Sequence, residues 1–371
     1  MEQKDGLSSP DVTSPGVTGL ERHLARRLLE TRGDPRIRIV LWNGEELRIG
    51  DTPPVGRLVL RERRVIWDLS RHPGTLGLGE AYASGRLEIE GDLTAVLKLA
   101  FALPPRETLL QRAVWRWQLL RRRSRSLGDA RANVHHHYDL GNDFYALWLD
   151  RQMAYTCAYF PTPSASLEDA QLAKFEHVAR KLWLQPGERV VEAGCGWGSL
   201  ALHMARHHGV RVTAYNISSE QIRYAREQAR AQGVAERVEF REDDYRNISG
   251  QYDVFVSVGM LEHVGPENYA ALGRVIDRSL GPGGRGLVHS IGRVKQRPMD
   301  PWISRRIFPG AYQPTLEEMV GILSPHDFAV LDVEDLRLHY EKTLEHWLER
   351  FEKNAAAVER RFVERFGRMW R

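Results

Sequence analysis

The chain has 371 residues, of which 42% are hydrophobic and 27% charged, and its net charge is +4. This length exceeds what one ordinary hydrophobic core supports and favours about two domains. With only two cysteines, Cys157 and Cys195, a disulfide-stapled secreted fold is excluded and a reduced, intracellular setting is expected. No apolar run approaches the ~20 residues that span a bilayer. Residues 1–20 lack a signal-peptide pattern and are expected to form a disordered tail.

The segment after this tail, up to residue 127, predicts a small α+β domain. A helical pattern covers residues 20–32, and partial period-two alternation predicts strands within residues 37–49 and 56–69. A turn-rich stretch then leads to a short strand and to a helix that begins after Asp92.

The motif Ser-Gly-x-Leu-x-Ile-x-Gly-Asp at residues 84–92 resembles the end of a sterol-carrier-type lipid-binding domain. The resemblance implies a lipid-binding-like domain over residues 21–127, and an unrelated small α+β domain is the alternative. Residues 109–133 then interleave arginines with Trp115 and Trp117. Such a stretch fits either a solvated linker or an interfacial membrane helix, with rings at headgroup depth and guanidinium groups on phosphate.

Residues 128–371 are predicted to form a second, α/β domain. Helices and apolar strands alternate from about residue 170, which indicates a doubly wound parallel sheet. The first strand runs into Glu192-x-Gly194-x-Gly196-x-Gly198, just before a helix. Glycines there let the backbone approach a ligand and expose helix N–H groups. The spacing differs from that of the dinucleotide fingerprint and is that of the class I (Rossmann-like) S-adenosylmethionine methyltransferases.

The ends of the following strands supply further expected contacts to S-adenosylmethionine. Asn216 stands where such enzymes usually carry an acidic residue for the ribose hydroxyls, and Gln221 is expected to share this role. Asp244 and Tyr245 follow the third strand and are expected at the adenine amine and ring face; simple packing is the alternative for Tyr245. The cofactor residues predicted from these loops are Glu192, Gly194, Cys195, Gly196, Asn216, Ile217, Gln221, Asp244 and Tyr245.

Nucleic-acid aminomethyltransferases place an Asn/Asp-Pro-Pro-aromatic clamp after the fourth strand, whereas this chain has SVGMLEHVGPENY, so no nucleic-acid partner is expected.

Five linked segments resemble one family. The segments HHHYDLGNDFYALWLD, MAYTCAYF, GCGWGSLALHMA, MLEHVGPENY and HYEKTLEHWLERF together resemble the cyclopropane-fatty-acyl-phospholipid synthases and mycolic-acid cyclopropane synthases.

The resemblance implies a site that binds a bicarbonate ion beside the cofactor. The implied bicarbonate ligands are Cys157, Glu262, His289, Tyr340 and the backbone near Ile291. Tyr138, Tyr155 and Thr156 are implied at the methionine end of S-adenosylmethionine. Without the resemblance, MAYTCAYF is interpreted as a buried strand or hairpin in which Cys157 is a small core residue. The histidines at 135–137 are not expected to bind metal, because adjacent residues rarely converge on one ion.

The implied activity is transfer of a methylene group to the double bond of acyl chains in membrane phospholipids, which gives cyclopropane chains. Three alternatives remain: a methyl- or methylene-branched product from the same cation, a non-catalytic lipid-binding protein, and a small-molecule methyltransferase. The expected location is the cytoplasm, peripherally on the inner face of the membrane, and a homodimer is possible.

Overall fold

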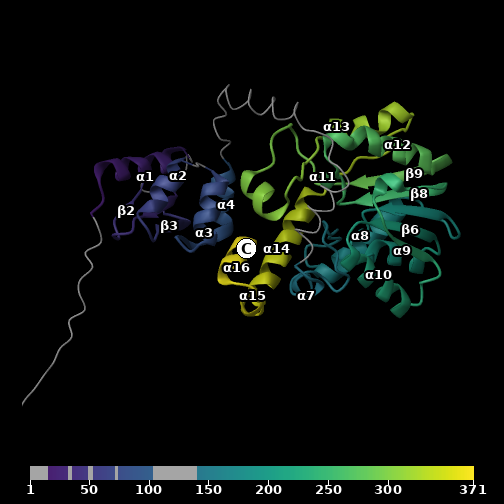
Figure 1. Cartoon of the computed structure of the whole chain (residues 1–371), viewed down its shortest axis with the longest axis horizontal. Helices are drawn as coiled ribbons and strands as arrows, with labels where there is room; N and C mark the ends of the chain where they lie inside the picture. The colour runs from purple at the N-terminus through teal and green to yellow at the C-terminus, as the bar shows by residue number, and fades with distance from the viewer. Residues whose placement is uncertain (1–15, 32–35, 49–52, 72–73, 103–139) are drawn as a thin grey trace, which may run out of the picture. The chain divides into compact units, whose positions relative to one another are not determined.

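The computed structural model describes residues 16–31, 36–48, 53–71, 74–102 and 140–371, and the chain divides into two compact units (Figure 1). Unit 1 holds the described residues up to 102 together with Phe362–Trp370, and unit 2 holds residues 140–361 and Arg371. The sequence assigned Phe362–Trp370 to the catalytic domain, whereas the structure groups this segment with unit 1. The expected tail of residues 1–20 also ends earlier in the structure, because Val17 is buried in the core of unit 1.

Unit 1 is built on a four-stranded sheet in the order β2-β1-β3-β4. The central pair β1 and β3 is parallel and the two outer pairs are antiparallel, so the predicted α+β character is present. The elements are α1 (Gly19–Thr31), β1 (Ile37–Val40), β2 (Glu46–Leu47), β3 (Gly56–Leu60), α2 (Arg64–Arg71), α3 (Thr75–Ala83), β4 (Leu87–Gly91) and α4 (Leu93–Ala102).

Two helices of unit 1 differ from the sequence prediction. The second half of the strand predicted over residues 56–69 is helix α2, whose buried side chains Val65, Ile66 and Leu69 lie on one helical face. The β-branched residues favoured a strand there, but the spacing of the buried positions is helical. Helix α3 occupies a stretch that was interpreted as turns, because its two glycines, Gly77 and Gly79, are poor helix formers.

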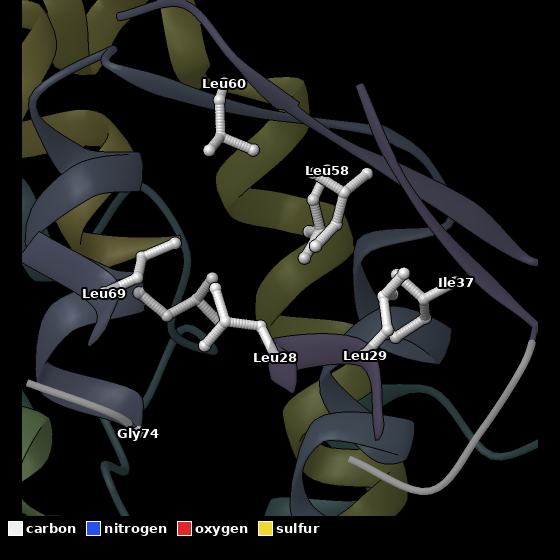
Figure 2. A pocket seen from close by; sticks show the side chains of 9 residues that line it. Leu28, Leu29, Ile37, Leu58, Leu60, Leu69 and Gly74 are labelled. Atoms are coloured by element: carbon white, nitrogen blue, oxygen red, sulfur yellow. The ribbon is translucent and has the colours of Figure 1, made fainter. Parts of the chain in front are cut away.

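The core of unit 1 contains a small apolar cavity of about 30 Å³ (Figure 2). Its lining is Leu28, Leu29, Ile37, Ile39, Leu58, Leu60, Leu69, Gly74 and Leu78. One water molecule needs roughly 10–15 Å³ of cavity volume. The cavity therefore has room for about two waters and is far too small for a lipid chain. Helix α16 (Glu364–Trp370) completes the unit: Arg368 donates to the Tyr82 carbonyl oxygen at 2.8 Å and pairs with Glu88 at 3.1 Å.

Unit 2 is built on a five-stranded sheet in the order β7-β6-β5-β8-β9, in which every neighbouring pair is parallel. The doubly wound parallel sheet predicted from the sequence is therefore present. Its strands are β5 (Arg189–Ala193), β6 (Arg211–Asn216), β7 (Val238–Glu242), β8 (Tyr252–Val258) and β9 (Leu280–His289).

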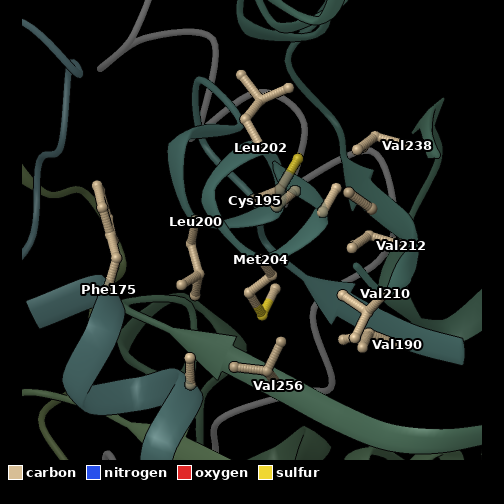
Figure 3. Packing of buried hydrophobic residues seen from close by; sticks show 14 of the residues in the cluster. Phe175, Val190, Cys195, Leu200, Leu202, Met204, Val210, Val212, Val238 and Val256 are labelled. Carbon is tan, nitrogen blue, oxygen red and sulfur yellow. The ribbon is translucent and has the colours of Figure 1, made fainter. Parts of the chain in front are cut away.

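Helices cover both faces of this sheet because successive strand residues point to opposite sides. On β5, Val190 packs into one buried cluster with residues of α8, α9 and α10 (Figure 3), and Val191 packs into the other cluster with residues of α12. These helices are α8 (Leu167–Lys181), α9 (Ser199–His207), α10 (Ser219–Ala231) and α12 (Tyr269–Ser279).

Shorter helices and the carboxyl-terminal segment complete unit 2. They are α7 (Asn142–Tyr145), η1 (Tyr245–Asn247), α11 (Leu261–Val264), η2 (Pro266–Asn268), the single π-helical turn η3 (Ile303–Ile307), α13 (Leu316–Leu323), η4 (Ser324–His326), α14 (Arg337–Lys353) and α15 (Ala355–Arg361). In the part of the chain that the structure describes, no helix combines the length and apolar character that crossing a membrane requires.

Candidate functional site

The carboxyl ends of β5 and β8 mark the point where the strand order reverses, since β6 and β8 flank β5 on opposite sides. Ligands of doubly wound sheets bind at this position. The glycine loop follows β5, and Gly259 and Met260 follow β8. The two loops touch, because a Cβ on Gly194 would lie 2.7 Å from the Cβ of Met260.

The glycine loop has one packed and one open glycine. Gly194 and Gly196 both have left-handed backbones, with φ of 81° and 53°. At Gly194 a side chain would overlap Met260, so this glycine serves packing between the loops. At Gly196 a Cβ would meet nothing within 4 Å. The backbone of Gly196 therefore faces open space, as a close approach to a ligand requires.

Glu192, the penultimate residue of β5, is buried, and its Oε2 has no hydrogen-bond partner among the described residues. Burial raises the pKa of this carboxyl to about 8, and the charge of Lys174 opposes that shift. An unsatisfied buried carboxyl oxygen is costly. A hydroxyl or ammonium group of S-adenosylmethionine would satisfy it, so the residues present fit this cofactor.

Asn216 stands at the end of β6 as predicted, but its amide hydrogens are already used. Its Nδ2 donates to the Gly196 carbonyl oxygen at 3.1 Å and to Gln221 Oε1 at 2.7 Å. Asn216 therefore ties the glycine loop to α10, and toward ribose hydroxyls it offers an acceptor oxygen rather than donors. Ile217 follows it and is half-buried.

Asp244 and Tyr245 follow β7 as predicted. The Asp244 carboxylate caps η1 and pairs with Arg246 at 2.7 Å, so part of its accepting capacity is used within the protein. Burial raises the pKa of Tyr245 to about 12, and its hydroxyl has no partner among the described residues. The side chain of Cys195 packs in the core cluster of Figure 3, which leaves its backbone as the part that can meet a ligand.

The segment Met153–Phe160 is irregular and is neither the strand nor the hairpin that its apolar residues suggested. Its two tyrosines have different surroundings. Tyr159 stacks between His177 and His339, with ring centroids 4.3 and 4.7 Å away. Tyr155 lies in an aromatic cluster, where its ring centroid is 5.2 Å from Trp347 and 6.3 Å from Phe308.

Cys157 is buried at the carboxyl-terminal side of this segment. Its single S–H lies within reach of two acceptors, the carbonyl oxygens of Ala158 at 3.2 Å and Leu336 at 3.8 Å. Burial raises the pKa of the thiol to about 11, so the sulfur keeps its proton at neutral pH. This state suits a hydrogen-bonding ligand and not a nucleophile.

Glu262 and Ile291 are joined directly. The Ile291 N–H donates to Glu262 Oε1 at 2.6 Å, while Glu262 Oε2 is buried without a partner among the described residues. Burial raises the pKa of the Glu262 carboxyl. The backbone near Ile291 was implied as a bicarbonate ligand. In the structure the Ile291 N–H is bonded to Glu262, and the unsatisfied Oε2 of Glu262 is left to meet a ligand.

His289 and Tyr340 reach the same region from β9 and α14. The Gly259 N–H donates to the His289 carbonyl oxygen at 2.9 Å, which places His289 beside the end of β8. Burial lowers the pKa of its imidazole to about 4, so the ring is neutral at pH 7. The Tyr340 N–H donates to the Leu336 carbonyl oxygen at 3.0 Å, the same oxygen that Cys157 approaches.

One buried polar residue of this region was not predicted. Lys174 on α8 is 3% exposed, and its ammonium donates to Thr156 Oγ1 at 2.7 Å. Its sequence signal is its position on the buried stripe of α8, between Ala170 and Val178. Tyr138, the histidines at 135–137 and the Arg/Trp stretch of residues 109–133 lie outside the described residues.

Two family models match the chain. The model described as mycolic acid cyclopropane synthetase matches residues 125–371, and a domain of unknown function matches residues 24–106. The amino-terminal match ends at residue 106 and the other begins at residue 125, three residues before the boundary predicted at residue 128.

Curated relatives match along most of the chain. A "Probable fatty acid methyltransferase" from Pseudomonas putida is 36% identical over 343 residues, which cover 90% of this chain and 86% of that protein. A "Cyclopropane-fatty-acyl-phospholipid synthase" from Escherichia coli (strain K12) is 39% identical over 306 residues, covering 80% of this chain and 77% of that protein.

Solved structures match about two thirds of the chain. A cyclopropane synthase from Mycobacterium tuberculosis has a TM-score of 0.62 at 26% identity and covers 65% of this chain and 89% of that one. A mycolic acid cyclopropane synthase complexed with SAH and CTAB has a TM-score of 0.61 at 29% identity, with the same coverage of 65% and 89%.

Proposed function

Because the chain belongs to the mycolic acid cyclopropane synthetase family, we propose that it forms cyclopropane rings at the cis double bonds of unsaturated acyl chains in membrane phospholipids. The chain is an S-adenosylmethionine-dependent methyltransferase with an α/β fold, so the family, the fold class and the enzyme class predicted from the sequence are confirmed. The phospholipid substrate and the cyclopropane product are the proposal.

The observation that carries the proposal is the aromatic cluster around Tyr155. Its ring centroid lies 5.1 Å from Trp148 and 5.2 Å from Trp347, and Tyr340 is 6.2 Å from Trp347. An isolated alkene carries neither a lone pair nor a proton that must leave before it reacts, so its reaction depends on positioning in a dry apolar site. Aromatic faces also stabilise the positive charge that develops on the acyl chain.

The polar residues of the site divide between two ligands. S-adenosylmethionine, when bound, supplies an activated methyl group, and the glycine loop with Glu192 would hold it. Cys157, Glu262, His289 and Tyr340 would hold bicarbonate, which we propose as the base of the reaction. The neutral imidazole and the phenol can each donate one hydrogen bond to such an anion. The thiol of Cys157 has one hydrogen, which would turn from the backbone carbonyl oxygens to the anion when it binds. Glu262 would orient it through the oxygen that is unsatisfied in the structure.

The setting follows from the substrate. We propose a cytoplasmic enzyme that associates peripherally with the inner face of the membrane, because a double bond at mid-chain depth is reached only from the surface. Acyl chains at that surface are then the partner, and a homodimer is the proposed assembly. The relative from Escherichia coli, named for a phospholipid substrate, supports this choice of acyl carrier.

The test is to express the gene in a bacterial host that lacks its own cyclopropane synthase and to analyse the extracted phospholipids. We expect a mass gain of one methylene group per modified chain and the strongly upfield proton signals of a cyclopropane ring. A host carrying the empty vector is the control. If the mass gain is found together with the signal of a methyl branch, the product is branched and the proposed cyclopropane is wrong. If the phospholipids stay unmodified while labelled free fatty acids are converted, the proposed substrate is wrong.

A further inference from the structure

We propose that Lys174 is a positioning residue of this site: its ammonium group fixes the Thr156 hydroxyl as a hydrogen-bond donor to a carboxylate-type anion. The inference rests on the proposed function, because it concerns the ligands of that same site. Two anions in the proposed site have such a group: the amino-acid carboxylate of S-adenosylmethionine, and bicarbonate. Both would accept a hydrogen bond from Thr156 in the same way.

Two buried side chains one turn apart on α8 hold the segment that contains Thr156. Gln171 Nε2 donates to the carbonyl oxygens of Thr156 at 2.9 Å and Ala154 at 3.2 Å. Lys174 Nζ donates to Thr156 Oγ1 at 2.7 Å. On its other side the Thr156 methyl group packs against Gly259, where an added Cβ would lie 2.7 Å from it. Both the backbone and the side chain of Thr156 are therefore held in place.

The direction of the hydrogen bond determines what Thr156 can offer. An ammonium group donates only, so the Thr156 oxygen must accept from Lys174. The single proton of the hydroxyl then has to be donated elsewhere. Thr156 is half-buried, next to Cys157 and the end of β8. A donor held at this position, with a positive charge directly behind it, suits an oxyanion.

The surroundings of Lys174 are acidic or neutral on every packed side. Asp150 precedes the segment, Cys157 lies within it, Glu192 comes from β5, and His289 from β9 is neutral at pH 7. Burial lowers the pKa of Lys174 from 10.5 to about 8, and Asp150 is the first of the charges that oppose this shift. The lysine is thus mostly protonated at pH 7 and loses its proton as the pH rises through about 8.

Deprotonation of Lys174 should stabilise the native state but weaken binding of the anion. Between pH 8 and 10.5 the unfolded chain holds a proton that the native protein has released, so raising the pH stabilises the native state through Lys174. Binding, in contrast, should weaken over the same rise, because the donor to Thr156 loses its charge. A purely structural lysine would not weaken binding there.

The experiment compares Thr156→Val, Lys174→Met and the double variant with the parent by calorimetry. S-adenosylhomocysteine is titrated into each protein, and bicarbonate is titrated into each protein saturated with S-adenosylhomocysteine. Each single variant should weaken one of the two affinities roughly tenfold or more, and the double variant should add little. A lower affinity for S-adenosylhomocysteine identifies the anion as the amino-acid carboxylate of the methyl donor. A lower affinity for bicarbonate identifies the anion as bicarbonate.

Lys181→Met is the matched control, since this lysine lies two turns further along α8 and pairs with Glu334 at 2.9 Å. It should leave both affinities unchanged. The affinity of the parent for the anionic probe should fall above pH 8 more steeply than that of Thr156→Val. This variant keeps both Lys174 and Glu192, so the two proteins differ only in the Thr156 hydroxyl. This comparison still tests the proposal if Lys174→Met does not fold.

The proposal is overturned if Thr156→Val binds both probes as the parent does, or if its pH profile matches that of the parent. Neither measurement uses turnover. A protein that forms no cyclopropane would therefore refute the proposed function without deciding the role of Lys174.

Discussion

Burial determines the chemistry of Cys157. In its buried position the thiol has a pKa of about 11 and donates its hydrogen to backbone carbonyl oxygens. A thiolate beside a methyl sulfonium would itself be methylated, so a protonated thiol protects the methyl donor. The same burial that suggested an ordinary core cysteine is thus what makes this residue usable as a hydrogen-bond donor.

The role of Glu262 in holding bicarbonate can be separated from that of Cys157. We expect Glu262→Gln to lower turnover about tenfold or more, because a carboxyl group that orients an anion is lost. Cys157→Ser should cost less, since a hydroxyl still donates a hydrogen bond. Turnover is measured in carbonate-depleted buffer and after bicarbonate is added back.

Glu317→Gln, on the exposed first turn of α13, serves as the control for loss of a negative charge. Full turnover of Glu262→Gln without added bicarbonate would remove Glu262 from the proposed anion site.

Sequence motifs located residues well but not their hydrogen bonds. Cys157, Glu262 and His289 were implied by the family resemblance, and their ligand roles stay predictions. Glu262 follows β8 and His289 ends β9, whereas Cys157 precedes every strand of this sheet. The partners of Asn216 could not be foreseen, because Gly196 is 20 residues away and meets it only after β5 and β6 pair. Lys174 was missed for a related reason: helical periodicity marks a buried position but does not show what the side chain meets.

At the scale of elements, the glycine loop gives a sharper test than its sequence alone allowed. Gly196→Val should abolish binding of S-adenosylhomocysteine while the fold persists, since the new side chain would occupy open space in front of the loop. Valine is strained at the left-handed φ of both glycines, and Gly194→Val should lower stability further, because its side chain would also overlap Met260. Calorimetry and thermal unfolding distinguish the two. A Gly196→Val protein with unchanged affinity would show that the ligand lies elsewhere.

The two units were predictable to different degrees. In unit 2, the alternation of strands with helices located all five strands from the sequence. The central strands β5 and β8 are buried along nearly their whole length and give continuous apolar runs. In unit 1, short elements with mixed patterns left α2 and α3 unrecognised. The segment has four apolar residues, of which three are consecutive, so the sequence does not show which of them are buried; the helical spacing appears only once Val65, Ile66 and Leu69 are seen to pack into the core.

At the scale of the whole molecule, the proposed membrane contact is Arg121, Arg122 and Arg123, which lie outside the described residues. Each arginine near an anionic surface contributes on the order of 1 kcal/mol. Changing all three to glutamate should therefore weaken sedimentation with anionic vesicles on the order of 100-fold, most strongly at low salt. Affinity for S-adenosylhomocysteine should not change.

The control makes the same change of charge elsewhere, at the exposed residues Arg206, Arg223 and Arg230 of unit 2. If both triple variants sediment with vesicles as the parent does, residues 121–123 act as a solvated linker. If both lose binding equally, total charge and not this segment controls attachment.

The return of α16 to unit 1 makes the catalytic unit an insertion within the other one. The chain leaves unit 1 before residue 140 and comes back at Phe362, where Arg368 bonds to Tyr82 and Glu88. The two units are therefore joined by two covalent crossings. Cutting either crossing leaves the other intact, so a single proteolytic nick cannot release the catalytic unit. Conversely, a gene fragment that stops before Phe362 removes a helix from the amino-terminal domain, although the deletion is made at the opposite end of the chain.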